Sequence, residues 1–455
     1  MRKSYFYIFL CSIFFLTGCE IVPHEDISDP LAISIANPNF VPIDDALNEM
    51  YSLLGAINSK TRSIASKSVK SVEVLGRESL STSTRSSDLI PEQALYIVNF
   101  NEGGFALLAA DNRYDPVLAI TNEGKFSLSD FNKTSTTTKT QGLTLEDLYC
   151  AEDDEYYIGS DDPVDVISQF VQDYLSITDE GEELIIDPSQ IITSYEYSDW
   201  IEYGSVPALL STKWKQGYPF NSLCPTKDGT PLPAGCVAIA VMQIVAYHQT
   251  PPTTDYDSQT ISGITKPHET SSSWAELIAG LDDDNKYSTA AFIARHIGHK
   301  CNTNYNFCWT GQSFSTPRRA KNAFEAAPLN YTNAYKYNSY NETKILEQLN
   351  ASNPVFVAGI SGNVDGHAWV IDGYIQRRQE KTAYYLDGSS GVVNTHAKTQ
   401  KLVHCNWGWG GDCDGYYISG LFDLTNGAEL VKEGDSNETE DCNFTWWFRT
   451  LTVNP

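Results

Sequence analysis

One cysteine opens the most apolar segment of the 455-residue chain. Cys236 follows Gly235, and residues 237–247 after it are apolar apart from Gln243, which predicts a helix buried at the centre of a domain. At a helix N-terminus the unpaired amides and the macrodipole favour a thiolate over a thiol, so Cys236 is a candidate nucleophile. Taken alone, the same residue is more typical of a buried structural cysteine, so other residues must support the catalytic interpretation.

A thiolate nucleophile needs a partner for proton transfer, and His367 is the best candidate among the eight histidines. It opens an apolar, strand-like segment, 367–374, directly after a glycine-containing loop. Asn406 follows a second such segment, 401–405, and its side chain can accept a hydrogen bond from the imidazole while Trp407 shields that bond from water. A core histidine and a sugar-stacking tryptophan loop are the alternatives, but the order cysteine, histidine, asparagine with wide gaps is that of papain-like enzymes.

Four motifs in this order resemble those of the streptopain family of bacterial cysteine peptidases. They are residues 209–221, 235–238, 366–368 and 406–410. The resemblance covers most of the chain and implies an α+β fold, with a papain-like two-lobed catalytic domain behind a small α+β pro-domain. It also implies an enzyme that hydrolyses peptide bonds in protein or peptide substrates.

Residue by residue, the resemblance assigns a role to each matching position. Cys236 would be the nucleophile that forms a thioester, and His367 its base and acid. Asn406 would orient the imidazole beside Trp407. Gln216 would complete an oxyanion hole with the main-chain N–H of Cys236, because both groups can donate to the oxygen that becomes negative during attack.

The N-terminal half predicts a separate small unit. Apolar residues recur at helical spacing over 44–58, and residues 59–88 are polar enough to predict a flexible linker. Three short strands joined by turns are predicted at 95–100, 105–110 and 117–121, and a helix is predicted after Asp162. We assign residues 19–90 to a tether and 91–195 to an inhibitory pro-domain. Residues 196–455 then form the catalytic domain, with maturation expected between 193 and 208.

The first residues predict export. Arg2 and Lys3 precede an apolar stretch too short to span a bilayer, which is typical of a signal peptide over residues 1–18. Residues 16–19 resemble a lipobox, so we expect Cys19 to be lipidated and to anchor the protein to a bacterial envelope membrane. Maturation would then release the catalytic domain. An ordinary cleaved signal is the alternative.

Composition narrows the function classes. Lysine and arginine total 31 against 58 acids, a net charge of −27, which argues against nucleic acid as a partner. No cofactor and no metal are implied, since the cluster around His296 and His299 matches no familiar zinc module. The spacings of Cys301 to Cys308 and of Cys405 to Cys413 are compatible with local disulfides, although no pairing is assigned.

Two other functions fit parts of the sequence. A surface lipoprotein with an unused triad could bind glycans or host protein through its aromatic residues, which include nine tryptophans. Acyl transfer from the thioester to an amine instead of water would make the protein a ligase.

Overall fold

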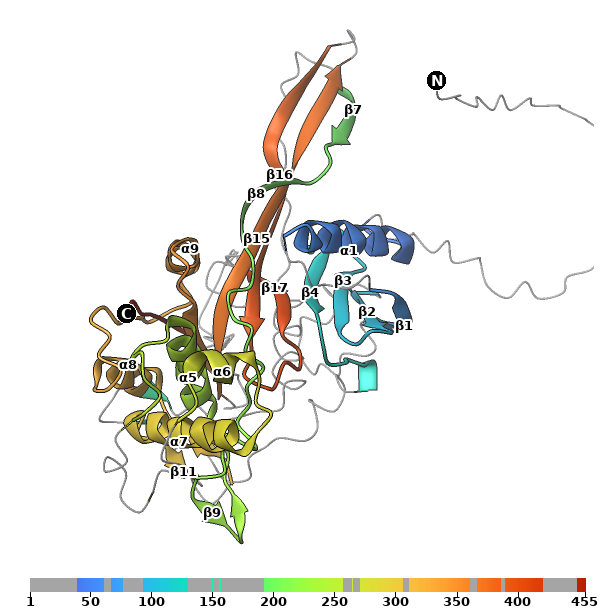
Figure 1. The fold of residues 1–455 in the computed structure, drawn as a ribbon. Coiled ribbons are helices and arrows are strands. Elements are labelled where there is room, and N and C mark those ends of the chain that lie inside the picture. Colours follow the sequence, from blue (N-terminus) through green and yellow to red (C-terminus); the bar gives the residue numbers. More distant parts are fainter. Residues whose placement is uncertain are drawn as a thin grey trace, which may run out of the picture. The chain divides into compact units, whose positions relative to one another are not determined.

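The computed structural model of the protein describes part of the chain, and every structural statement below concerns that part (Figure 1). The described residues are 39–60, 67–76, 93–129, 149–150, 155–156, 192–256, 264, 271–305, 311–360, 366–385, 389–419 and 448–455. The expected signal peptide, Cys19 and the helix predicted after Asp162 lie outside them. Among the described residues, no helix combines the length and the apolar character needed to cross a bilayer.

A single mixed-length antiparallel sheet organises the described residues, with helices packed on it (Figure 1). Its strand order is β1-β2-β3-β4-β17-β16-β15-β14-β18-β13, and β7 and β8 also pair with β15. The α+β class predicted from sequence is therefore confirmed. The strands of the sheet are β1 (Val69–Leu75), β2 (Leu95–Phe100), β3 (Phe105–Ala109), β4 (Val117–Thr121), β7 (Ile192–Tyr197), β8 (Ile201–Val206), β13 (Tyr335–Tyr337), β14 (Val355–Ile360), β15 (Gly366–Tyr385), β16 (Ser390–Asn406), β17 (Gly415–Ile418) and β18 (Arg449–Thr452).

Short strand pairs and helices complete the fold. The pairs are β5 (Tyr149–Cys150) with β6 (Glu155–Tyr156), β9 (Thr226–Lys227) with β10 (Thr230–Pro231), and β11 (Asn304–Tyr305) with β12 (Ser313–Phe314). The helices are α1 (Ile43–Asn58), α5 (Cys236–His248), α6 (Trp274–Ala279), α7 (Asp284–Lys300), α8 (Pro317–Glu325) and α9 (Glu342–Asn350).

The N-terminal unit confirms most of its predicted elements. Helix α1 buries the residues of its predicted apolar face against β3 and β4, and β2 to β4 occupy the predicted strand positions. The linker prediction over 59–88 is wrong for the segment 69–75, which is β1 and pairs antiparallel with β2. As an edge strand, β1 exposes Val72 and Val74 and buries only Leu75, so its polar composition does not prevent pairing.

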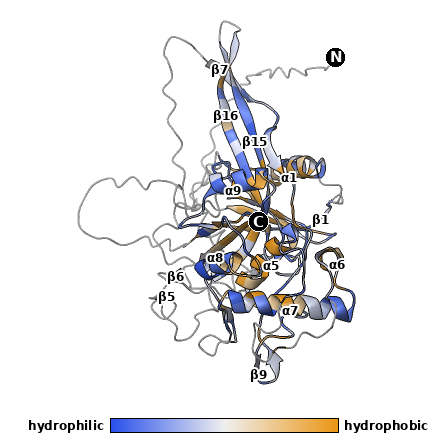
Figure 2. Ribbon diagram, turned by 60° about the vertical axis from the view of Figure 1, so that its left-hand side comes forward, coloured by the Kyte–Doolittle hydropathy of each residue, from blue (hydrophilic) through white to orange (hydrophobic). Residues whose placement is uncertain are grey.

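Helix α5 is the buried helix that the sequence predicts. Figure 2 shows it as hydrophobic along its length, and all of its residues from 236 to 246 are buried. It contacts α7, α8, β14 and β15. A helix that is apolar on every side can be stable only when other elements surround it, which explains its central place in this lobe.

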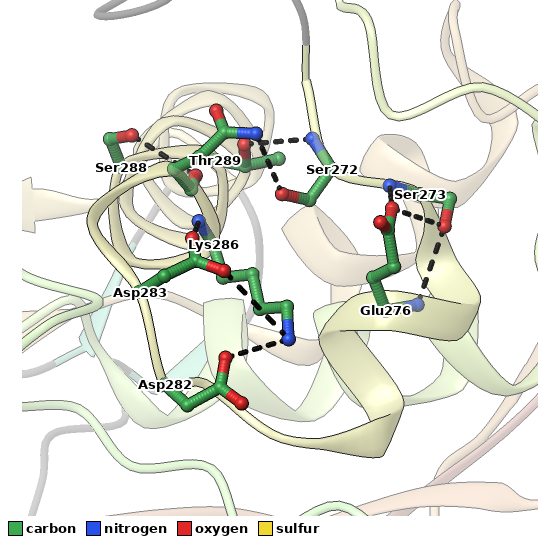
Figure 3. Close-up of polar contacts among 9 residues, drawn as sticks. Ser272, Ser273, Glu276, Asp282, Asp283, Lys286, Ser288 and Thr289 are labelled. Atoms are coloured by element: carbon green, nitrogen blue, oxygen red, sulfur yellow. Dashed lines mark hydrogen bonds and ion pairs between the residues drawn. The ribbon is translucent and has the colours of Figure 1, made fainter.

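Capping interactions fix the two helices beside α5 (Figure 3). Ser273 and Glu276 form a reciprocal capping box at the start of α6, and Asp283 caps α7 by accepting from the Lys286 N–H. The N–H of Ser272 donates to Thr289 Oγ1 of α7 at 3.1 Å. These bonds satisfy amides that a helix N-terminus leaves unpaired, and they join α6 to α7.

Three apolar cores are built around the sheet, one of them between α1 and strands β2 to β4. Successive side chains of a strand point to opposite faces. On β15, Ala368 and Val370 belong to the core around α5, whereas Trp369 and Ile371 belong to the core shared with β2 to β4. Strand β15 thus contributes to apolar cores on both faces of the sheet.

Strands β15 and β16 form one long hairpin, seen rising past α1 in Figure 1. Along the other edge of β15, three strands pair in succession: β14 at residues 366–371, β8 at 374–378 and β7 at 381–385. The predicted domain boundary between residues 195 and 196 falls inside β7.

The N-terminal unit joins the remainder of the sheet directly. Strand β4 pairs antiparallel with β17, with Thr121 opposite Gly415. The N–H of Asn122 donates to the Asp414 carbonyl at 3.0 Å, and Lys213 forms an ion pair with Glu123. This continuity between units was not predicted from the sequence.

Candidate active site

Cys236 is the first residue of α5. Gly235 precedes it as the N-cap with φ of 96°, a left-handed conformation that favours glycine. No side chain caps this end of the helix, so its first amides and the macrodipole face the cysteine. The location at the head of a buried helix is the one predicted from the sequence.

His367 lies near the start of β15 and is buried. Its Nε2 is 2.9 Å from the carbonyl oxygen of Trp407. A carbonyl can only accept, so Nε2 carries the proton and Nδ1 of the neutral ring has a free lone pair. Nδ1 has no hydrogen-bond partner among the described residues. This tautomer can accept a proton at Nδ1.

Burial controls the charge of this imidazole. It lowers the pKa of His367 to about 4, and the bond to the Trp407 carbonyl only partly opposes that shift. At neutral pH the ring is therefore uncharged in this structure. The side-chain environments of Cys236 and His367 are nearly closed, since each residue exposes only 2% of its surface.

Three indoles surround the imidazole. Trp409 stacks on it with ring centroids 4.5 Å apart, and Trp407 and Trp369 lie 6.0 and 6.3 Å away. Trp407 and Trp369 are part of the core that also contains residues of β2 to β4, whereas Cys236 is part of the core around α5. The cysteine and the rings around the histidine thus belong to different cores.

The loop after β16 bridges these two cores. Gly408 has φ of 74°, and a Cβ there would lie 3.2 Å from Cγ2 of Ile239, one turn into α5. A side chain at this position would be crowded against α5 and would strain the left-handed main chain. The main chain that holds the imidazole through the Trp407 carbonyl therefore rests against the cysteine helix.

Asn406 is buried at the end of β16 but does not make the bond expected of it in this structure. Its Nδ2 donates to the Thr212 carbonyl at 2.8 Å, and its Oδ1 accepts from the Gly408 N–H at 3.2 Å. The imidazole instead uses the carbonyl of Trp407, one residue further on. An orienting bond from Asn406 to His367 stays a prediction for the active form.

Gln216 lies on a segment that contacts both the chain before Cys236 and the loop after Asn406. Its carbonyl accepts from the Ala234 N–H at 2.9 Å, two residues before Cys236. The preceding Lys215 forms a bridge with Trp409. Gln216 is buried, and its Oε1 has no hydrogen-bond partner among the described residues. The structure therefore brings the segment of Gln216 next to those of Cys236 and Asn406.

Sequence reasoning missed a buried histidine–aspartate pair between β15 and β16. Nδ1 of His404 on β16 is 2.6 Å from Oδ1 of Asp372 on β15, and Oδ2 of Asp372 accepts from the Leu210 N–H at 2.8 Å. The charge of Asp372 raises the pKa of His404 against the effect of burial. An aspartate inside the apolar run 368–374 was the available signal.

A second missed contact anchors the segment before Gln216. Oγ1 of Thr212 donates to Oε1 of Gln243 at 2.8 Å. Gln243 is the polar residue in the middle of α5 and is fully buried. Its role is to hold residues 209–216 on the cysteine helix.

The disulfides compatible with the sequence are not formed. Cys301 and Cys405 are buried thiols outside any disulfide, so neither local bridge exists. Each packs as a small apolar side chain, Cys301 in the core around α5 and Cys405 in the other core. Cys224 is also a buried thiol, and burial raises its pKa to about 11.

No metal site stands out in the described part of the chain. No group of three or more histidine, cysteine, aspartate or glutamate side chains there could hold an ion. His296 and His299 lie on α7, where His296 is buried against Tyr256 with ring centroids 4.9 Å apart.

Comparison with family models divides the chain in two. Residues 214–417 match the peptidase C10 family, and residues 41–140 match the Spi protease inhibitor family. The inhibitor match begins at α1, so it includes α1 and β1, which the sequence analysis assigned to a tether. The catalytic match includes Cys236, His367, Gln216 and Asn406.

Known proteins resemble the chain over most of its length. Streptopain of Streptococcus pyogenes is 22% identical over 415 residues, covering 84% of this chain and 87% of its own. The thiol protease/hemagglutinin PrtT of Porphyromonas gingivalis is 26% identical over 411 residues, covering 84% of this chain and 41% of its own. Among solved structures, a fragment of Prevotella intermedia prointerpain A is 19% identical with a TM-score of 0.43, covering 85% of this chain and 98% of that one. The chain belongs to the streptopain family and is a cysteine peptidase that carries an inhibitor-like pro-domain.

Proposed function

We propose that the chain is an endopeptidase that cleaves proteins through a thioester on Cys236, with His367 as the base and acid. The tautomer of His367 carries this proposal. Its Nε2 proton is committed to the Trp407 carbonyl, so Nδ1 is the atom that can exchange a proton with a thiol. The helix N-terminus at Cys236 favours the thiolate that this transfer produces.

The reaction follows from these groups. His367 Nδ1 takes the thiol proton, and Sγ of Cys236 attacks the carbonyl carbon of the scissile peptide bond. The carbon–nitrogen bond then breaks, and the imidazolium gives its proton to the departing amine. Water, deprotonated by the same imidazole, releases the acid and restores the thiol. Acyl transfer to an amine would share every step but the last.

Stabilisation of the negative oxygen needs donors already in place. We propose the Cys236 N–H and the Gln216 side chain for this role, because the Gln216 segment is bonded to Ala234 just before the cysteine. Loss of one such donor typically costs about 3 kcal/mol of transition-state stabilisation. Asn406, at the end of β16, would orient the imidazole in the active enzyme, with Trp407 shielding it.

The chain is a cysteine protease zymogen, and we propose that removal of the N-terminal unit opens the site. Two observations support this. Cys236 and His367 each expose only 2% of their surface, which leaves little of either side chain open to a substrate. The uncharged His367 also cannot stabilise a thiolate as an ion pair.

We propose that maturation occurs between residues 193 and 208, as the sequence predicts. This window covers most of β7 and all of β8, which pair with β15 and lie along the chain between the two regions that match family models. N-terminal sequencing of the processed protein tests the proposal. A mature N-terminus far outside the window would contradict it.

We further propose that the precursor is exported and lipidated on Cys19, so that its membrane partner is a bacterial envelope membrane. The support is the signal and lipobox pattern in residues 1–19 alone. Labelled palmitate should enter the wild-type precursor and not Cys19→Ala. Equal labelling of both would refute lipidation without touching the enzymatic proposal.

The proposal for the catalytic residues is tested on a general protein substrate with the full chain, expressed as the precursor and then processed by an added protease. The wild type should react with a thiol-directed peptide inhibitor, and Cys236→Ala should lose cleavage by at least about a thousandfold. Cys224→Ala, at another buried thiol, is the matched control and should keep activity. Cleavage retained by Cys236→Ala would exclude it as nucleophile, and glycan binding without cleavage by the wild type would favour the surface-binding alternative.

A further inference from the structure

A buried carboxyl group stands behind the loop that holds the imidazole. Asp414 precedes β17 and is buried. Its Oδ1 accepts the main-chain N–H of Trp407 at 2.8 Å. Trp407 is itself fully buried, so this N–H would otherwise have to find another acceptor in the interior. The catalytic roles described above do not use this side chain.

The hydrogen bond to Asp414 and the one that holds the imidazole are both made by the main chain of Trp407. The N–H of Trp407 is held by Asp414, and the carbonyl of the same residue holds His367 Nε2 at 2.9 Å. A hydrogen bond at each end of one residue restricts rotation of its main chain. The position of the imidazole therefore depends on the Asp414 carboxyl through a single intervening residue.

The main chain of Asp414 is held from the other side. Its carbonyl accepts from Asn122 of the inhibitor-like unit, and its N–H donates to the Gly411 carbonyl at 3.2 Å. Gly415, the next residue, pairs with Thr121 of β4. In the precursor, the main chain of Asp414 is thus held by its own loop and by residues 121–122 of the inhibitor-like unit. In the processed enzyme, the bonds to Gly411 and to the Trp407 N–H would remain.

The charges around Asp414 are few and identified. His404, Asp372 and Glu123 are the charged groups that act on it. Burial raises the pKa of Asp414 to about 7, while the Trp407 N–H and His404 oppose that shift. In either protonation state a carboxyl oxygen remains to accept the N–H of Trp407.

We propose that Asp414 is a positioning residue for the reaction, acting through the main chain of Trp407 on the place and tautomer of His367. The inference rests on the proposed function of His367. It predicts that the acceptor oxygen at this position matters, and that its negative charge does not. An amide should therefore replace the carboxyl, and a methyl group should not.

The experiment compares Asp414→Ala, Asp414→Asn and Asp412→Ala, each expressed as the full chain and then processed. Asp412 is exposed in the same loop and serves as the control. We expect Asp414→Ala to lower kcat at least about tenfold with KM within about twofold, and Asp414→Asn to regain most of that loss. Melting temperatures and the rate of Cys236 alkylation are measured on the same samples.

Each result decides one question. An Asp414→Ala enzyme with wild-type kcat would overturn the inference. Equal losses in Asp414→Ala and Asp414→Asn, in proportion to a fall in melting temperature, would also overturn it and leave a purely structural role. If wild-type cleavage does not depend on Cys236 and His367, the proposed function fails instead, which the parallel Cys236→Ala and His367→Ala samples reveal.

Discussion

Gly415 offers a direct test of the join between the inhibitor-like unit and the catalytic sheet. A Cβ at this position would lie 2.6 Å from the Cα of Thr121 in β4, and closer still to the Ile120 carbonyl oxygen. Carbon atoms in contact are normally about 3.5 to 4.0 Å apart, so Gly415→Ala must push the two strands about 1 Å apart. Both obstacles are main-chain atoms, which cannot rotate away.

The expected cost follows from the bonds at this join. The Asn122 N–H is 3.0 Å from the Asp414 carbonyl, and a shift of about 1 Å lengthens this bond beyond any useful hydrogen-bond distance. Loss of this bond and of one neighbouring ladder bond removes about 2 kcal/mol at about 1 kcal/mol each. Since 1.4 kcal/mol is a factor of ten, amide exchange in β4 should accelerate about thirtyfold.

Hydrogen exchange followed by mass spectrometry measures this locally. Peptides that cover β4 and β17 should exchange faster in Gly415→Ala, whereas peptides that cover α5 should not change. Gly391→Ala is the matched control, because a Cβ on that glycine of β16 meets nothing within 4 Å. Processing of the precursor should also become faster. Unchanged exchange in β4 would show that the two units do not depend on this strand pair.

Two further predictions concern buried charge. The pKa of His367 is lowered from 6.5 to about 4, so the folded chain binds fewer protons there than the unfolded chain, and stability falls as pH falls from about 6.5 to 4. In urea titrations over this pH range, the free energy of unfolding of the wild type should fall by up to about 3 kcal/mol, and that of His367→Gln should not. Parallel losses in both proteins would refute this source of acid sensitivity. Arg377 is buried on β15, where it donates to Gln400 of β16 and Ser52 of α1 and lies 4.5 Å from the Trp200 ring. Arg377→Lys keeps the charge but loses the planar fork, so it should lower the free energy of unfolding by about 1 to 3 kcal/mol. It should also expose the aromatic residues around Trp200 to chymotrypsin, and a variant as resistant as wild type would contradict this role.

The local elements were accessible from the sequence because their signals are local. Helix α5 is apolar on every side, and its hydrogen bonds join residues four apart, so a run of residues suffices to predict it. The hairpins β2 to β4 are joined by short turns whose residues mark them. Strand β1 escaped prediction because an edge strand needs a partner more than it needs apolar residues.

The chemistry of the site divides in the same way. The residue types at 236, 367 and 406 and their order along the chain indicate a thiol peptidase before any coordinates are known. Which group accepts the hydrogen bond from the imidazole depends on small differences in distance between segments 40 residues apart. Here the acceptor is the Trp407 carbonyl and not the Asn406 side chain. Sequence spacing carries no information at that resolution.

The sequence by itself therefore determined the nucleophile helix, the short hairpins and the class of chemistry, since each depends on neighbouring residues or on residue type. Only the tertiary structure decided that β4 continues the catalytic sheet through β17, that Asp372 and His404 are paired, and that Asp414 lies behind Trp407. These features are hydrogen bonds between distant segments, and their strength depends on burial that many residues create together. No single stretch of the chain encodes such a contact.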